Sequence, residues 1–192
     1  MVIKGYFVKE SGGDGVGDQE QGISECAAAI PAMPQMTDED LALLEKYSRT
    51  FTGAFAHTLD GKGRMVIPQA FRDMLGKTFT VVPEFDFKSI AVYPELAYVR
   101  MRESHDKALR ENPNPERKKY LQWLDAYTFR AQEYDGQGRV LLPARLRQII
   151  LGEDKEVDIM GAGDHLRIAL RVKCEEQLMD FIANIDSVLA NM

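Results

Sequence analysis

Hydrophobic residues in this 192-residue chain occur in short clusters with two different periods, which predicts an α+β protein. Four clusters are rich in branched and aromatic residues, as is typical of buried strands. They comprise residues 79–82 and 90–93, separated by a turn at 83–88, and residues 157–160 and 166–170, separated by a turn at 161–164. Each pair is therefore expected to form two extended segments joined by a turn.

Other segments place apolar residues three or four positions apart, which predicts amphipathic helices. The first begins after Thr37, whose side chain is expected to cap a helix with acidic residues in its first turn. Two more lie between residues 95 and 131, the second beginning at Asn114-Pro115, and one lies near the C-terminus. The positions along these last three stripes are Tyr98, Met101, His105 and Leu109; Tyr120, Leu124, Tyr127 and Ala131; and Leu178, Phe181, Ile182, Ile185 and Leu189. We expect the stripes to pack against the strands or against a neighbouring subunit.

An internal repeat, displaced by 75 residues, is the most informative feature of the chain. Residues 60–72 (Asp-Gly-Lys-Gly-Arg-Met-Val-Ile-Pro-Gln-Ala-Phe-Arg) align without gaps on residues 135–147 (Asp-Gly-Gln-Gly-Arg-Val-Leu-Leu-Pro-Ala-Arg-Leu-Arg). Six of the thirteen positions are identical and four more are apolar in both copies. This ordered self-similarity indicates that one structural unit was duplicated.

Each copy of the repeat predicts a turn, a short strand and a helix. The Asp-Gly-x-Gly segment supplies a carboxylate that can bind backbone N–H groups and glycines that tolerate positive φ. Three apolar residues follow, and Pro68 or Pro143 then suits the first position of a helix, expected at 69–75 and 144–151. With the extended pairs described above, each unit reads strand, turn, strand, helix, strand, turn, strand.

Charge and composition limit the classes of function. The formal net charge is −6, of which −5 lies in residues 1–50, so the remainder can still present a local basic face. Residues 11–22 are rich in glycine and acid and are expected to be flexible. Cys26 and Cys174 suggest no disulfide framework, and no segment resembles a signal peptide or a membrane span. A cytoplasmic protein is expected.

The sequence lacks a convincing set of catalytic or metal-binding residues. His105 lies on an apolar helix stripe, and His57 and His165 lie at turns without partners at ligand spacing. The glycine clusters match no nucleotide-binding pattern, and the Asp-Gly-x-Gly segments lack the later acids of a calcium loop. We therefore expect no enzymatic activity, no metal, no cofactor and no small-molecule substrate.

The repeated turns are the best candidates for a functional site. Asp60 and Asp135 are expected to cap the turns and to pair with Arg72 and Arg147, which would hold each strand against its helix. Arg64 and Arg139 follow the turns and have no obvious core partner, so they suit phosphate or the O6 and N7 edge of guanine. The candidate DNA-contacting residues are Lys62, Gly63, Arg64, Gln137, Gly138 and Arg139. A two-stranded ribbon in the major groove is a plausible arrangement.

These motifs resemble the MraZ family, whose two repeats belong to the AbrB-like swapped-hairpin superfamily of double-psi type. The resemblance covers about residues 51–170 and implies an α+β fold of two tandem modules with intervening and C-terminal helices. The expected divisions are an acidic, partly disordered extension with a short helix at 1–50, a first repeat at 51–94, a helical spacer at 95–131, a second repeat at 132–171 and a C-terminal helix at 172–192.

The resemblance also implies a function. Members regulate the cell division and cell wall gene cluster, usually repress their own promoter, and bind short G-rich direct repeats as ring-shaped homo-oligomers. The expected partners are thus double-stranded promoter DNA and further copies of the chain, in the cytoplasm at the nucleoid. Lys62 and Arg64 match the family's DNA-contacting segment, with Gln137 and Arg139 as their counterparts in the second repeat.

Two alternatives remain open at this point. The protein could be a ring-forming interaction scaffold whose turns are structural and make no direct DNA readout. The acidic first fifty residues, unusual for the family, could be a regulatory arm, or translation could start at Met33 or Met36.

Overall fold

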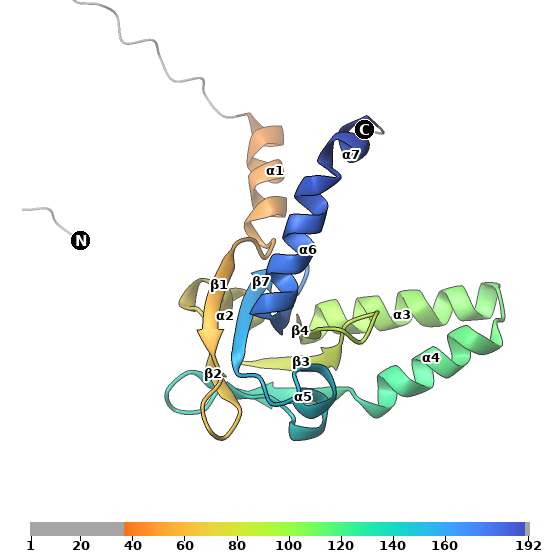
Figure 1. Cartoon of the computed structure of the whole chain (residues 1–192). Coiled ribbons are helices and arrows are strands. Elements are labelled where there is room, and N and C mark those ends of the chain that lie inside the picture. Colours follow the sequence, from red (N-terminus) through yellow and green to blue (C-terminus); the bar gives the residue numbers. More distant parts are fainter. Residues whose placement is uncertain (1–36, 191–192) are drawn as a thin grey trace, which may run out of the picture. The chain divides into compact units, whose positions relative to one another are not determined.

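The computed structural model describes residues 37–190, which form seven helices and eight strands (Figure 1). The strands are β1 (Ala54–Thr58), β2 (Arg64–Val66), β3 (Thr78–Pro83), β4 (Ile90–Pro94), β5 (Phe129–Glu133), β6 (Arg139–Leu141), β7 (Glu156–Gly161) and β8 (Leu166–Leu170). The helices are α1 (Asp38–Ser48), α2 (Gln69–Leu75), α3 (Glu95–Glu111), α4 (Pro115–Ala126), α5 (Ala144–Ile150), α6 (Arg171–Ala183) and α7 (Ile185–Leu189). The segment 11–22 and the alternative starts at Met33 and Met36 lie outside the described residues. No helix in the described range is both long and apolar enough to cross a bilayer.

The two repeats exchange strands within one six-stranded antiparallel sheet. Its order is β1-β7-β8-β4-β3-β5, so the first strand of each repeat pairs with a strand of the other repeat. The hairpins β3–β4 and β7–β8, predicted from the two pairs of apolar stretches, meet at the centre of the sheet through β4 and β8. The order reads the same when the repeats are interchanged, which is the swapped-hairpin arrangement expected of two tandem AbrB-like modules.

A separate two-stranded ribbon joins the repeats a second time. Strand β2 pairs antiparallel with β6, so that Met65 lies opposite Val140 at the centre of the ribbon. Because the strands run in opposite directions, the turn before β2 and the turn before β6 lie at opposite ends of this ribbon. The strand β6 ends beside the first turn, and the helix α5 therefore begins there.

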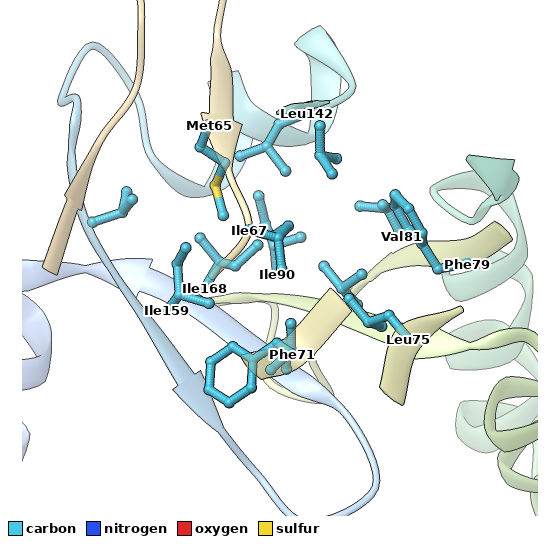
Figure 2. Close-up of a cluster of buried hydrophobic side chains, with 14 of the residues drawn as sticks. Met65, Ile67, Phe71, Leu75, Phe79, Val81, Ile90, Leu142, Ile159 and Ile168 are labelled. Carbon is cyan, nitrogen blue, oxygen red and sulfur yellow. The ribbon is translucent and has the colours of Figure 1, made fainter. Parts of the chain in front are cut away.

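One hydrophobic core lies between the sheet, the ribbon and the two short helices (Figure 2). Ile67 and Leu142, which follow the two ribbon strands, are both 0 % exposed, as are Ile159 and Ile168 of the central hairpin of the second repeat. This core therefore draws on both repeats and is shared between them. Removing apolar surface from water, worth about 25 cal/mol per Å², stabilises the exchanged arrangement as a unit.

The helix boundaries follow local sequence signals. Thr37 caps α1 as expected: its Oγ1 accepts from the backbone N–H of Asp40 at 3.1 Å, and the Asp40 carboxylate accepts from the Thr37 N–H at 2.8 Å. The helix α2 has the predicted bounds, because Pro68 precedes its first residue and Gly76, at φ 81°, follows its last. The α5 helix ends one residue before the expected position.

The predicted helix from Asn114 to Ala131 is shorter than expected. The helix α4 ends at Ala126, and Phe129–Glu133 form β5 along the open edge of β3. Ala131 adopts a left-handed conformation (φ 51°) and donates its N–H to Glu95 Oε1 at 2.8 Å. The apolar spacing suited a longer helix, but pairing with β3 and this contact to the start of α3 satisfy the backbone of this segment instead.

The helices α3 and α4 pack on the other face of the β3–β4 hairpin. Their buried contacts form a second cluster that includes Tyr98 and Leu124. By contrast, the apolar positions of α1, α6 and α7 lie largely open to solvent among the described residues. Leu178 and Phe181 of α6, for example, retain 57 % and 50 % of their surface. The C-terminal stripe therefore does not pack against the strands of this chain.

Candidate nucleic-acid interface

The first repeated turn is built around the Asp60 carboxylate. Its Oδ1 accepts hydrogen bonds from the backbone N–H groups of Lys62 and Arg64, both at 2.9 Å. Gly63 donates to the Asp60 carbonyl at 2.9 Å and has φ 78°, a conformation that side chains with a Cβ rarely adopt. The sequence folds locally in this way because aspartate followed by glycines can satisfy the turn's own donors.

The second turn repeats this geometry almost bond for bond. Asp135 Oδ1 accepts from the N–H groups of Gln137 and Arg139 at 2.9 and 3.0 Å. Gly138 has φ 72° and donates to the Asp135 carbonyl at 2.9 Å. The duplication inferred from sequence thus extends to individual hydrogen bonds.

The ion pairs expected for these turns were assigned to the wrong arginines. Asp60 pairs with Arg64 of its own turn, through Arg64 Nε and Nη2 at 2.7 Å from Asp60 Oδ2, and not with Arg72. In the second repeat, Arg139 Nε donates to Asp135 Oδ2 at 2.7 Å, so Asp135 is not paired with Arg147. Each turn reverses the chain so that the N–H of Asp60 donates to the Arg64 carbonyl, and that of Asp135 to the Arg139 carbonyl, both at 2.9 Å. The residue four positions on is therefore the nearer cation.

This pairing affects both members. The pKa of Asp60 lies well below the ordinary aspartate range, because the carboxylate accepts hydrogen bonds from the backbone N–H and the side chain of Arg64. The backbone N–H of Lys62 lowers it further, and burial opposes these effects. The pKa of Asp135 is lowered in the same way, first by the backbone N–H of Arg139. The side chains of Arg64 and Arg139 are each 27 % exposed, so both remain accessible while ion-paired.

The arginines on the short helices contact the opposite repeat. Arg147 of α5 donates from Nη1 to the carbonyl of Lys62 at 3.0 Å, and its guanidinium covers Gly63 so closely that a Cβ there would overlap it. On the other side, the Arg72 guanidinium of α2 covers Gly138 in the same manner. Local sequence spacing contains no signal for these contacts, which arise only from the exchange of strands.

The outward face of the ribbon combines cations with apolar side chains. Met65 and Val140 point into the core, so their neighbours point away from it. On this outer face Arg64 lies opposite Leu141, and Val66 lies opposite Arg139. Leu141 and Val66 retain 54 % and 39 % of their surface. Residues 65–67 are three successive apolar residues, so the sequence pattern did not show which of them point outward.

The whole candidate interface therefore comprises two equivalent turns at the ends of one ribbon. Lys62 and Gln137 are exposed at the two turn tips, and the missing Cβ atoms of Gly63 and Gly138 let the backbone lie close to the helix arginines. Guanidinium, ammonium and amide donors arranged on a narrow ribbon can bind phosphates and the acceptors of base edges. We define this surface as the ribbon face.

The three histidines lie away from the ribbon face. His165 is nearly buried, with Nδ1 2.8 Å from Asp164 Oδ1 and Nε2 3.1 Å from Glu84 Oε1, and its ring stacks on Tyr93. His105 lies near Tyr120 on the inner side of α3. Within residues 37–190 no group of three or more histidine, cysteine, aspartate or glutamate side chains is arranged to hold a metal ion.

Two exchanged hairpin repeats around one core, each presenting a glycine turn in front of a short helix, define a tandem AbrB-like swapped-hairpin protein. The sequence profile of the family described as "MraZ protein, putative antitoxin-like" matches residues 50–118 and 129–184. The chain belongs to the MraZ family.

Named relatives agree with this assignment. The chain is 31 % identical to the transcriptional regulator MraZ of Pediococcus pentosaceus over 142 residues, which cover 74 % of this chain and 96 % of that protein. It is 32 % identical to the transcriptional regulator MraZ of Desulfitobacterium hafniense over 147 residues, covering 74 % and 98 %. The Mycobacterium bovis regulator of the same name is 37 % identical over 118 residues, covering 62 % and 79 %. Transcriptional regulators are not a class of enzymes.

Proposed function

We propose that this protein is a sequence-specific, DNA-binding transcriptional repressor of the division and cell wall gene cluster, including its own promoter. In this proposal it binds short G-rich direct repeats as a ring-shaped homo-oligomer at the nucleoid. The ribbon face supplies the DNA contacts. The family relationship supports the class of regulator, and the geometry of the two turns supports the direct contact with DNA.

The observation that carries this proposal is the pairing of each accessible guanidinium with its own turn. A carboxylate bound to Arg64 Nε and Nη2 restricts the rotation of the side chain while leaving Nη1 without an acceptor in the described part of the chain. A guanidinium that is already held in one orientation loses less conformational entropy when it binds a guanine or a phosphate. Each ribbon carries two such guanidiniums, and an oligomer would present several ribbons, which would give avidity for repeated sites.

The direct test is a DNA-binding titration with the gene's upstream region at two salt concentrations. Arg64→Ala is expected to weaken binding about tenfold or more, since one good arginine–guanine contact discriminates by about 1–3 kcal/mol. Lys119→Ala on α4 removes an equal charge far along the chain from the ribbon face and is the matched control. Unchanged affinity of Arg64→Ala, with wild-type binding intact, would remove the ribbon face from the proposal.

Exposed apolar residues on α6 and α7 support the oligomer. Eight large apolar side chains of these two helices are exposed: Val172, Leu178, Met179, Phe181, Ile182, Ile185, Val188 and Leu189. Exposed apolar side chains in such number are typical of surfaces that bind another protein. Leu178→Glu is expected to lower the mass of the particle in sedimentation velocity. An unchanged mass would place the subunit contact elsewhere, and a monomeric wild type would refute the ring.

A further inference from the structure

The short helix of each repeat lies beside the glycine turn of the other repeat. Because β2 and β6 are antiparallel, the end of β6 lies beside Arg64 at the start of β2, with Leu141 opposite it. The chain then enters α5 through Pro143, and Arg147 lies one turn further along that helix. The first turn is thus backed by the second repeat, and the converse holds for α2 and the second turn.

Arg147 both donates a hydrogen bond to the first turn and packs against its backbone. Its guanidinium donates to the carbonyl of Lys62, and the absence of a Cβ at Gly63 lets it lie directly against the backbone. The same turn is tied to the second repeat by the Leu142 N–H, which donates to the Gly63 carbonyl at 3.2 Å. An open cavity of about 370 Å³ lies beside these groups, lined by Asp60, Arg147 and others, so little else supports the turn on that side.

The second turn has a related but weaker support. Arg72 packs over Gly138, yet its Nε is buried and has no hydrogen-bond partner among the described residues. An arginine that donates to a backbone carbonyl restrains a turn more firmly than one that only packs against it. The two turns are therefore supported by the same type of residue to different degrees.

We propose that Arg147 and Arg72 are positioning residues that act across the repeats: Arg147 orients the first turn, with Lys62 and Arg64, and Arg72 orients the second, with Gln137 and Arg139. Neither helix arginine needs to touch DNA. The inference rests on the proposed function for its effect on DNA binding. Its effect on the turns themselves is independent of that function.

Hydrogen exchange in the DNA-free, full-length protein tests the positioning directly. Arg147→Ala is expected to speed exchange of the Gly63 and Arg64 amides about tenfold, the change that corresponds to losing about 1.4 kcal/mol of local stability. Exchange at Gly138 and Arg139 is expected to stay within about twofold of wild type. Arg145→Ala, an exposed change of the same type on the same helix, is the control. Equal acceleration at both turns would show general loosening and overturn the proposal, as would no acceleration at the first turn.

A double-mutant cycle on DNA affinity gives the second test. If Arg147 acts through the first turn, then Arg147→Ala adds little to the loss already caused by Arg64→Ala. It is expected to multiply the loss caused by Arg139→Ala, which lies in its own repeat. Arg147→Lys, which can still donate to the Lys62 carbonyl, is expected to recover part of the affinity. The opposite pattern, with coupling to Arg139 and none to Arg64, would refute the crosswise assignment.

Salt dependence separates positioning from direct contact. A phosphate-binding arginine lowers the slope of log affinity against log salt by about one when it is removed. A positioning arginine leaves the slope unchanged, and this is the result expected for Arg147→Ala. If the wild-type protein binds no promoter DNA, the proposed function fails, while the exchange experiment still decides whether the two repeats position each other's turns.

Discussion

His165 of the second repeat lies 3.1 Å from Glu84 of the first, Nε2 to Oε1, across 81 positions of sequence. The imidazole is also 2.8 Å from Asp164 and stacks on Tyr93 at 4.4 Å between ring centroids. The contact joins the turn of the β3–β4 hairpin to that of the β7–β8 hairpin. It is thus an electrostatic link between the two repeats, and it joins residues far apart in the sequence.

The free energy of unfolding is expected to depend on the protonation of His165. Burial disfavours the charged form, but the hydrogen bonds and charges of Glu84 and Asp164 outweigh it and raise the pKa of His165. A folded pKa above the unfolded value of about 6.5 means that the stabilisation is complete below that pH. It is then lost as pH rises through the folded pKa.

Urea titrations between about pH 6 and about pH 9 measure this dependence. His165→Gln is expected to flatten the decline of stability with rising pH. His105→Gln should leave it in place, since burial lowers the pKa of His105 and its own contribution has the opposite sign. A decline that persists in His165→Gln would assign it to another group.

The two glycines of the first turn are expected to differ sharply in tolerance. Gly63→Ala should destabilise the protein by about 1–3 kcal/mol, because it forces a Cβ into a left-handed conformation and against the Arg147 guanidinium. Gly61→Ala, two residues earlier, places its Cβ in open space and should change stability by no more than about 0.5 kcal/mol. Chemical denaturation of both variants makes the comparison, and similar losses would contradict the turn geometry.

Neighbouring leucines on the ribbon provide a test of its register. Leu142 is completely buried in the shared core, so Leu142→Ala should cost about 2–5 kcal/mol. Leu141 is 54 % exposed on the ribbon face, and Leu141→Ala should change stability by less than about 0.5 kcal/mol. Thermal and urea unfolding distinguish the two, and a reversed order would mean that the ribbon is shifted by one residue.

The turn tips differ by one charge, which predicts opposite effects on salt dependence. Lys62→Gln removes a cation from the first tip and should lower the slope of log affinity against log salt by about one. Gln137→Lys adds a cation to the second tip and should raise it by a similar amount. Binding titrations across a salt series measure both, and slopes that do not move would show that the tips lie away from the phosphates.

Asp60 offers a test in which two mechanisms predict opposite signs. If its carboxylate merely repels DNA, Asp60→Asn should strengthen binding. If it orients Arg64 through the ion pair, the neutral amide holds the guanidinium less firmly, and binding to the specific site should weaken about tenfold. We expect the weaker binding. Glu153→Gln, which removes the same charge from the cavity beside the first turn, is the control and should not weaken binding.

Local patterns predicted the regular elements because those depend on nearby residues. The helix α2 runs from Gln69 to Leu75 as predicted, since a proline precedes it and a glycine follows it. One exception was Ala131, assigned to a helix by its apolar spacing although it lies in β5. Another was the single C-terminal helix expected at 172–192, which is divided at Asn184 into α6 and α7. Spacing cannot reveal the open edge of β3, which offers this segment hydrogen bonds that a longer helix would not supply.

The roles of the six candidate DNA-contacting residues stay a prediction, but their placement shows how far local reasoning reaches. The aspartate-glycine turns form as predicted because their hydrogen bonds join residues within four positions of each other. The contacts of the helix arginines were not accessible in this way, because Arg147 and Arg72 reach the turns of the other repeat. For Asp60, both Arg64 and Arg72 were within reach along the chain, and only the reversal of direction at the turn selects Arg64.

By itself, the sequence of this protein determined the duplication, the two turns and the helices beside them, all of which depend on residues close together in the chain. Only the tertiary structure decided that Arg147 supports the turn of Lys62 and Gly63 and that His165 meets Glu84. The physical reason is that neither repeat can bury its apolar residues alone. The strands are exchanged to build one shared core, and that exchange brings together side chains from different repeats.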